Sequence, residues 1–124
     1  MKESPTVRTA RVYDRPARDD GTRVLVDRLW PRGLSRDTAR VAHWCKQVAP
    51  STELRKWYAH DPARFAEFSR RYRAELEDPE HAAALQELRA LAQSHTLTLV
   101  TATKAVEISQ AAVLAEVIRG THGT

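Results

Sequence analysis

Two short runs of apolar and β-branched residues constrain the fold of this chain more than any other feature. They are residues 24–26 (V-L-V) and residues 96–103 (T-L-T-L-V-T-A-T), and such runs are typical of buried strands. The chain between them carries helical patterns, and strands joined through a helical crossover pair in parallel. With an alternating run at residues 7–13, the sequence predicts an α/β fold with a small, mostly parallel sheet of about three strands packed with several helices.

The connection between the first two predicted strands leaves an alternative open. Residues 14–22 (D-R-P-A-R-D-D-G-T) form a polar loop with a turn signal at Asp20–Gly21. A hairpin between the two strands is compatible with this loop, although the loop is long for a tight one.

Helix starts are marked by short polar residues, some of them followed by proline. The side chain accepts a free N–H of the first turn, and Pro fits the first helical position. A further helix is predicted to stop at Pro50, because four apolar residues before it share one helical face. The four apolar residues are Val41, Trp44, Cys45 and Val48. The start signals of the other helices are Ser35, Ser51 or Thr52, Asp61–Pro62 and Asp78–Pro79. The last helix is predicted over residues 106–119 and ends at Gly120.

The composition is that of a single globular domain. Of the 124 residues, 42% are hydrophobic and 29% charged, with a net charge of +4. We expect one domain over residues 7–120, between loose tails at residues 1–6 and 121–124. No apolar run approaches the roughly 20 residues that cross a bilayer, and the single cysteine fits a reducing compartment. We therefore expect a cytoplasmic protein without membrane contact, and no pattern indicates its oligomeric state.

Polar side chains follow the run at residues 24–26, where its strand should end. Asp27, Arg28, Trp30 and Arg32 stand there, and Lys104 follows the run at residues 96–103. The carboxyl ends of parallel strands form the crevice in which α/β sheets bind ligands. Two guanidiniums can clamp a phosphate or carboxylate, while Asp27 orients one of them or acts as a base.

Each of these residues also has a structural interpretation. The acid and the two arginines can close the loop as an internal ion pair. Trp30 can pack in the core or loop instead of stacking on a ligand, and Lys104 can be an ordinary solvated lysine. Ser109 and Gln110, in the first turns of the last predicted helix, offer hydrogen-bond donors near Lys104.

A second polar cluster contains Arg55 and His60, which we add to the candidate ligand-binding residues. His60 stands next to Asp61, and this pair can work as an acid and base, but a helix cap explains Asp61 more simply. Cys45 is interpreted as a buried structural thiol. The histidines lack ligand-like spacing, so no metal site is predicted. No phosphate-binding glycine motif is present, so no cofactor is predicted either.

Several segments together resemble a known family. They are R-V-Y-D, V-L-V-D-R-L-W-P-R-G, A-P-S-T-E-L-R-K-W-Y-A-H-D-P, F-S-R-R-Y-R-A-E-L and T-L-T-L-V. Their order and spacing resemble the YeaO-like proteins, small bacterial proteins classed as a domain of unknown function, over residues 11–118. The resemblance implies a compact α/β protein and carries over no catalytic residue. Relatives tend to have an acid after the lysine and then a His-Asn pair, whereas this chain has Ala105 after Lys104 and lacks the pair. Chemistry carried by those groups would be lost or altered here, so whether the chain is an enzyme stays open.

The leading hypothesis is a protein that binds a small anionic ligand, bearing phosphate or carboxylate, at the strand-end crevice. The alternative is a nucleic-acid-associated or regulatory protein that uses an arginine-rich helical surface, although interleaved glutamates dilute its charge. That surface comprises Arg64, Arg70, Arg71 and Arg73. A structural or adaptor role without a small ligand is the third interpretation.

Overall fold

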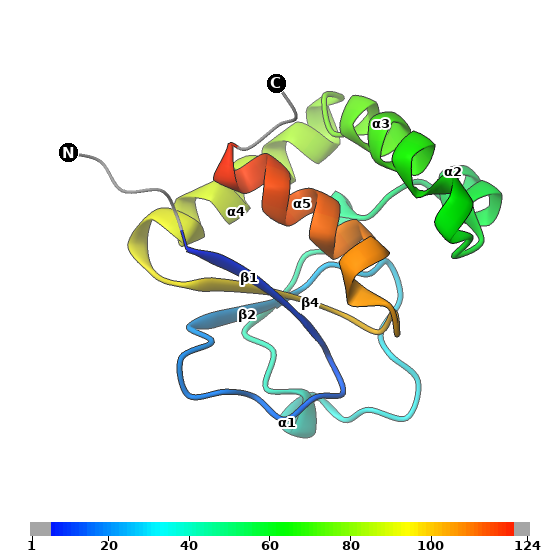
Figure 1. The fold of residues 1–124 in the computed structure, drawn as a ribbon. Helices are drawn as coiled ribbons and strands as arrows, with labels where there is room; N and C mark the ends of the chain where they lie inside the picture. Colours follow the sequence, from blue (N-terminus) through cyan, green and yellow to red (C-terminus); the bar gives the residue numbers. More distant parts are fainter. Residues whose placement is uncertain (1–5, 121–124) are drawn as a thin grey trace.

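The computed structural model describes residues 6–120, which form one parallel sheet covered mainly by helices on one face (Figure 1). The strands are β1 (Val7–Arg11), β2 (Thr22–Leu25), β3 (His43–Trp44) and β4 (Leu97–Thr101). Their order is β1-β4-β2-β3, and every neighbouring pair is parallel. The predicted small parallel sheet is confirmed, with the two-residue β3 as a strand beyond the three expected.

The helices begin where their polar start signals stand. The side chains of Ser35, Ser51, Asp61 and Asp78 each accept a backbone N–H of the following first turn, and Gly120 ends the last helix with a φ of 78°. The α-helices are α1 (Arg36–Ala39), α2 (Thr52–Tyr58), α3 (Phe65–Glu75), α4 (Pro79–Ser94) and α5 (Gln110–Arg119). Short 3-10 turns are η1 (Lys46–Val48), η2 (Pro62–Arg64) and η3 (Val106–Ile108).

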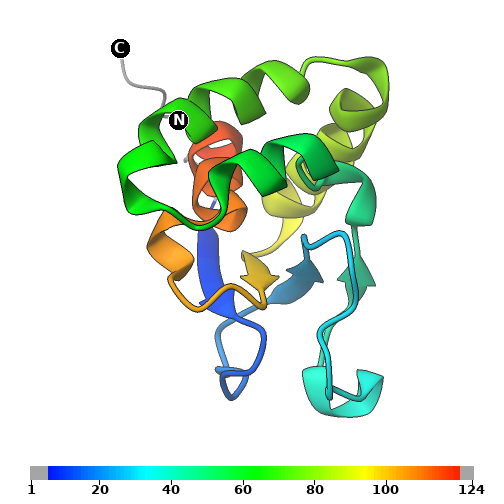
Figure 2. The same cartoon turned by 90° about the vertical axis from the view of Figure 1, so that its right-hand side faces the viewer.

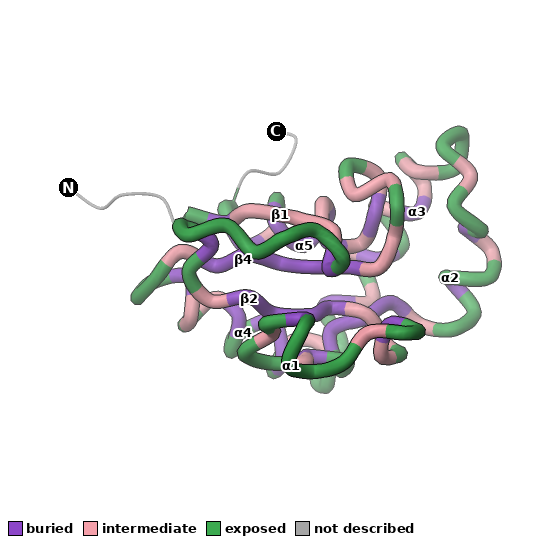
Figure 3. Tube along the Cα trace, turned by 90° about the horizontal axis from the view of Figure 1, so that it is seen from below, coloured by how far each residue is buried: buried purple, intermediate pink, exposed green. Residues whose placement is uncertain are grey.

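The two faces of the sheet are covered differently (Figure 2). Helices α4 and α5 contact the strands, α3 packs on α5, and α2 packs on α3, so the large core lies on this side. The other face carries a smaller core of Val12, Leu25, Ala39 and Val100, closed by the loop after β2 and by α1. Seen from that side, β4 and β2 are buried, whereas most of β1 is only half-buried (Figure 3).

The prediction of a helix that ends at Pro50 is wrong. Residues 43–44 pair with β2 instead, and the backbone N–H of Cys45 donates to the carbonyl of Leu25 at 2.8 Å. Extended backbone points neighbouring side chains to opposite faces, so Cys45 joins the large core and Trp44 packs against the small one. Cys45 is buried, as expected for a structural thiol.

Two further connections differ from the sequence interpretation. A hairpin between the first two strands does not form, because β4 lies between β1 and β2. The last predicted helix divides into η3 and α5, because Ser109 leaves the helical backbone region and caps α5 by accepting the N–H of Ala111. The predicted tails fall largely on residues 1–5 and 121–124, which lie outside the described residues; the carbonyl of Thr6 accepts a hydrogen bond from the N–H of Leu97.

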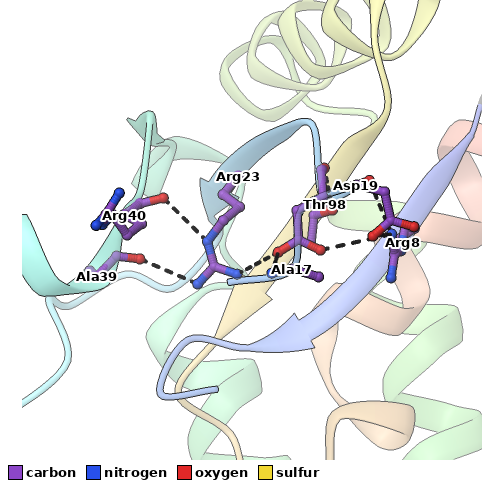
Figure 4. A network of polar contacts seen from close by, with 8 residues as sticks. Arg8, Ala17, Asp19, Arg23, Ala39, Arg40 and Thr98 are labelled. Carbon is purple, nitrogen blue, oxygen red and sulfur yellow. Dashed lines mark hydrogen bonds and ion pairs between the residues drawn. The ribbon is translucent and has the colours of Figure 1, made fainter. Parts of the chain in front are cut away.

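At the amino ends of the strands, a buried ion pair joins the loop before β2 to the rest of the sheet (Figure 4). Arg23 and Asp20 are each 5% exposed and lie 2.9 Å apart between Nη1 and Oδ2. Arg23 also donates to the carbonyls of Ala39 and Arg40, and the hydroxyl of Thr98 donates to the carbonyl of Asp20. This network therefore connects β2, β4 and the end of α1.

Candidate functional site

The carboxylate of Asp27 connects the ends of two strands to the start of α5. Asp27 follows β2, and its Oδ1 accepts hydrogen bonds from the Thr101 hydroxyl at 2.7 Å and from Nε2 of Gln110 at 2.5 Å. Its Oδ2 accepts the N–H of Ala102 at 2.8 Å. One acidic side chain thus holds the carboxyl ends of β2 and β4 and the first residue of α5 together.

Burial controls the electrostatics of this carboxylate. Removal from water raises the pKa of Asp27 above its ordinary value of 3.8. The hydrogen bonds from Ala102, Thr101 and Gln110 and the positive charge of Arg55 act in the opposite direction without outweighing burial. Arg55, an exposed residue of α2, therefore lies close enough to influence the site.

Arg28, the residue after Asp27, is partly buried. Its Nη2 donates to the carbonyl of Pro50 at 3.2 Å, just before the Ser51 cap of α2. Its Nε is buried, and no residue between 6 and 120 offers it a hydrogen-bond partner. Within the same range, neither Arg28 nor Arg55 forms an ion pair. The ion pair between Asp27 and Arg28, which the sequence allows as a structural alternative, therefore does not form.

Trp30 and Arg32 do not converge on the Asp27 carboxylate. The indole of Trp30 donates to the carbonyl of Leu34 at 2.6 Å and packs edge-on against Trp44, with ring centroids 5.5 Å apart. This is the loop-packing role that the sequence analysis kept as an alternative. Arg32 is exposed, and its carbonyl accepts the hydroxyl of Tyr13 at 3.0 Å.

His60 and Lys104 are both exposed. His60 lies in the turn after α2 with a φ of 57°, and its ring centroid is 6.2 Å from that of Tyr58. The neighbouring Asp61 caps η2 and pairs with Arg64, which is the simpler role that the sequence analysis gave it. Lys104 stands after β4 and forms no ion pair with any residue that the structure describes.

Two partners of Asp27 illustrate what sequence reasoning found and missed. The sequence predicts Gln110 as a donor near the strand ends, and Gln110 donates to Asp27. The sequence predicts Thr101 only as part of a strand, although its hydroxyl also donates to Asp27. The position of Thr101 near the carboxyl end of a predicted strand is the only sequence feature that points to a role in the site. Its partner, Asp27, lies 74 positions away in the sequence.

The arginine-rich surface of the nucleic-acid alternative is extensively paired with acids. Glu67 pairs with both Arg70 and Arg71, and Arg73 pairs with Glu116 across to α5. These contacts reduce the free positive charge that phosphate binding would use.

Two open cavities in the described part of the chain have no Asp27-site residue in their lining. One, of about 640 Å³, lies against α1 and is lined by Arg15, Pro16, Asp37, Thr38 and Arg40. The other, of about 510 Å³, lies among α3, α4 and α5.

Metal sites and membrane-spanning helices are absent from the described residues. Among residues 6–120, no group of three or more His, Cys, Asp or Glu side chains lies close enough together to hold a metal ion. Across the same residues, each helix is too short or too polar to span a membrane.

Comparison with known proteins identifies the family. The family described as the inactive DUF488-N3 subclade matches residues 6–122. Uncharacterized proteins of Mycobacterium bovis and Mycobacterium tuberculosis are each 54% identical over 97% of this chain and 99% of their own length. The YeaO protein of Escherichia coli is 38% identical over 91% of this chain and 96% of its own. No solved structure matches. The chain therefore belongs to the YeaO-like family of DUF488 proteins.

Proposed function

We propose that this protein binds a small anion, bearing phosphate or carboxylate, where the carboxyl ends of β2 and β4 meet α2 and α5. Open parallel sheets bind their ligands at this edge. Arg55 supplies positive charge close enough to act on the Asp27 carboxylate, and Arg28, the next residue after Asp27, reaches the carbonyl of Pro50 just before α2. Neither arginine forms an ion pair within residues 6–120. Lys104, after β4, adds a third cation to the same edge of the sheet.

The observation that carries this proposal is the unsatisfied Nε of Arg28. A buried donor without a partner costs about 1–3 kcal/mol of stability. An anionic oxygen reaching this nitrogen offsets that cost and adds a charge-assisted hydrogen bond. The guanidinium is already held on its other side by the carbonyl of Pro50, so little side-chain entropy remains to be lost on binding.

Binding, rather than catalysis, is the role we assign to the site. The carboxylate of Asp27 is engaged by three donors, which leaves it to position Gln110 and the end of β4. The family description refers to an inactive subclade, which also favours a binding protein. Asp27 is therefore a positioning residue, and the arginines contact the ligand.

A thermal-shift screen at fixed salt tests the proposal with inorganic phosphate, phosphosugars, nucleotides, small carboxylates and short DNA. A ligand at a hundred times its Kd adds about 2.7 kcal/mol to the free energy of unfolding. We expect one anion class to raise the melting temperature, Arg28→Ala and Arg55→Ala to remove the rise, and the control Arg18→Ala, in the distant loop before β2, to preserve it.

Two results would contradict this function. If every anion leaves the melting temperature unchanged, or if the rise persists in both arginine variants, the site does not bind anions. If DNA alone raises it, and the effect falls steeply with salt, the nucleic-acid alternative takes its place.

A further inference from the structure

The amide of Gln110 has only one orientation compatible with its neighbours. Its facing atoms are Oδ1 of Asp27 at 2.5 Å and Oγ1 of Thr101 at 3.4 Å. The Thr101 hydroxyl gives its single proton to Asp27 and accepts the N–H of Thr103. Both atoms that face the amide are therefore acceptors, so Gln110 must present its NH₂ group to them.

This orientation leaves the amide oxygen of Gln110 directed away from Asp27. No residue between 6 and 120 donates a hydrogen bond to this oxygen, and it is not among the fully buried side-chain atoms without a partner, so it is partly exposed. Gln110 is half-buried and begins α5, after the Ser109 cap. The site thus carries a free acceptor whose position is set by two hydrogen bonds of the amide nitrogen.

We infer that the ligand of this site is a hydroxylated anion, a small carboxylate or phosphate whose hydroxyl group donates to the amide oxygen of Gln110. This inference rests on the proposed function, because the arginines hold the anionic group. An ammonium group can also donate, but the charges of Arg28 and Arg55 disfavour a further cation at this edge. A hydroxyl group is therefore the donor that suits both the acceptor and the surrounding charge.

Calorimetric titration of the whole protein with matched ligands tests this inference. The carboxylates are lactate, propionate and 2-methoxypropionate; the phosphates are 2-hydroxyethyl, ethyl and 2-methoxyethyl phosphate. The methoxy compounds keep the oxygen but cannot donate, so they isolate the donor. We expect the hydroxylated member of one series to bind about tenfold more tightly than its methoxy partner, in line with one net hydrogen bond.

Two variants show which residues produce the preference for hydroxyl over methoxy ligands. Gln110→Met keeps the length of the side chain without its amide oxygen, and it should bring the hydroxyl and methoxy ligands to equal affinity while anion binding persists. Arg28→Ala should weaken all members of the series alike. Because Gln110→Met also removes a donor to Asp27, the comparison of ligands on the wild-type protein stands as evidence even if that variant folds poorly.

The outcomes separate the two proposals. If the wild-type protein binds hydroxyl and methoxy ligands equally, or if Gln110→Met retains the preference, the inference about Gln110 is wrong and anion binding stands. If no member of either series binds, the proposed anion site itself is overturned, and this inference with it.

Discussion

At the scale of single residues, the position of Asp27 follows from a local sequence pattern, whereas its hydrogen-bond partners do not. Its place after a predicted strand puts it at the edge of the sheet where a site is expected. Its oxygens, however, accept hydrogen bonds from Thr101, Ala102 and Gln110, residues that only the folded chain brings near. The carboxylate is therefore committed to holding three elements together rather than to an arginine.

The raised pKa of Asp27 predicts how stability depends on pH. The folded-state pKa lies above 3.8, so the folded protein keeps this proton to a higher pH than the unfolded chain. The resulting stabilisation is complete below 3.8 and is lost as the pH rises through the folded-state pKa. Relative to Asp27→Asn, which does not titrate, the free energy of unfolding of the wild type should fall across this window in urea denaturation. A carboxyl carbon NMR titration gives the pKa directly, and a value below 3.8 would contradict the prediction.

The candidate site could be predicted from the sequence only in part. The positions of some of its residues follow from neighbouring residues in the chain, whereas others depend on contacts with distant segments. Arg28 is placed by the strand that precedes it, which is a local pattern. Trp30 is next to the same strand, yet its partners are Leu34 and Trp44, and the loop that carries it packs on the small core. A sequence pattern can find the edge of a sheet, but it does not determine the direction taken by an irregular loop.

At the scale of elements, helix starts were predictable and the short edge strand was not. A cap such as Asp78 acts within its own first turn, so its signal is local. The apolar spacing of residues 41–48 matched a helix, but pairing with β2 satisfies the N–H groups of Ala42 and Cys45. Tertiary pairing overrides local periodicity in so short a segment.

The turn into β2 has a steric requirement for glycine. Gly21 has a φ of 67°, and a Cβ there would lie 2.1 Å from the carbonyl oxygen of Thr96, which accepts the N–H of Thr22. Gly33 has a φ of 75° but nothing within 4 Å of such a Cβ. Gly33→Ala should therefore cost only the left-handed backbone strain, about 1–2 kcal/mol. Gly21→Ala should cost about 1–3 kcal/mol more, because the backbone of Thr96, just before β4, must shift. Urea denaturation measures both, and equal losses would show that no close approach occurs at Gly21.

At the scale of the whole molecule, the two edges of the sheet serve different purposes. The carboxyl edge carries the candidate site, whereas the amino edge is closed by the buried pair of Asp20 and Arg23. On the face that carries α1, the network around Arg23 adds to the small core in attaching the end of α1 to the strands. Its contribution is therefore architectural.

Breaking this pair should destabilise the whole fold. Arg23→Met removes the close partner of the buried Asp20 and leaves only Nη1 of Arg8, 3.9 Å from its Oδ1, so we expect a cost of about 3 kcal/mol, the lower end of the range for a broken buried pair. The double variant Asp20→Asn, Arg23→Met should recover part of that loss because no unpaired charge remains. Arg70→Ala, which removes an exposed ion pair with Glu67, serves as the control and should leave the urea midpoint close to that of the wild type. A small effect of Arg23→Met would show that the pair is dispensable.

The strand order has a consequence for how the protein is made. The two amino-terminal strands do not pair with each other; both pair with β4, which begins at Leu97 of the 124 residues. During synthesis from the amino terminus, β1 and the edge of β2 that does not pair with β3 therefore keep unpaired backbone groups until most of the chain has been translated. Assembly of the sheet is thus a late, long-range event, slow by the measure of sequence separation. Until then, the exposed runs at residues 7–11 and 22–26 are the segments from which nascent chains would associate, and the ones that a chaperone would need to cover.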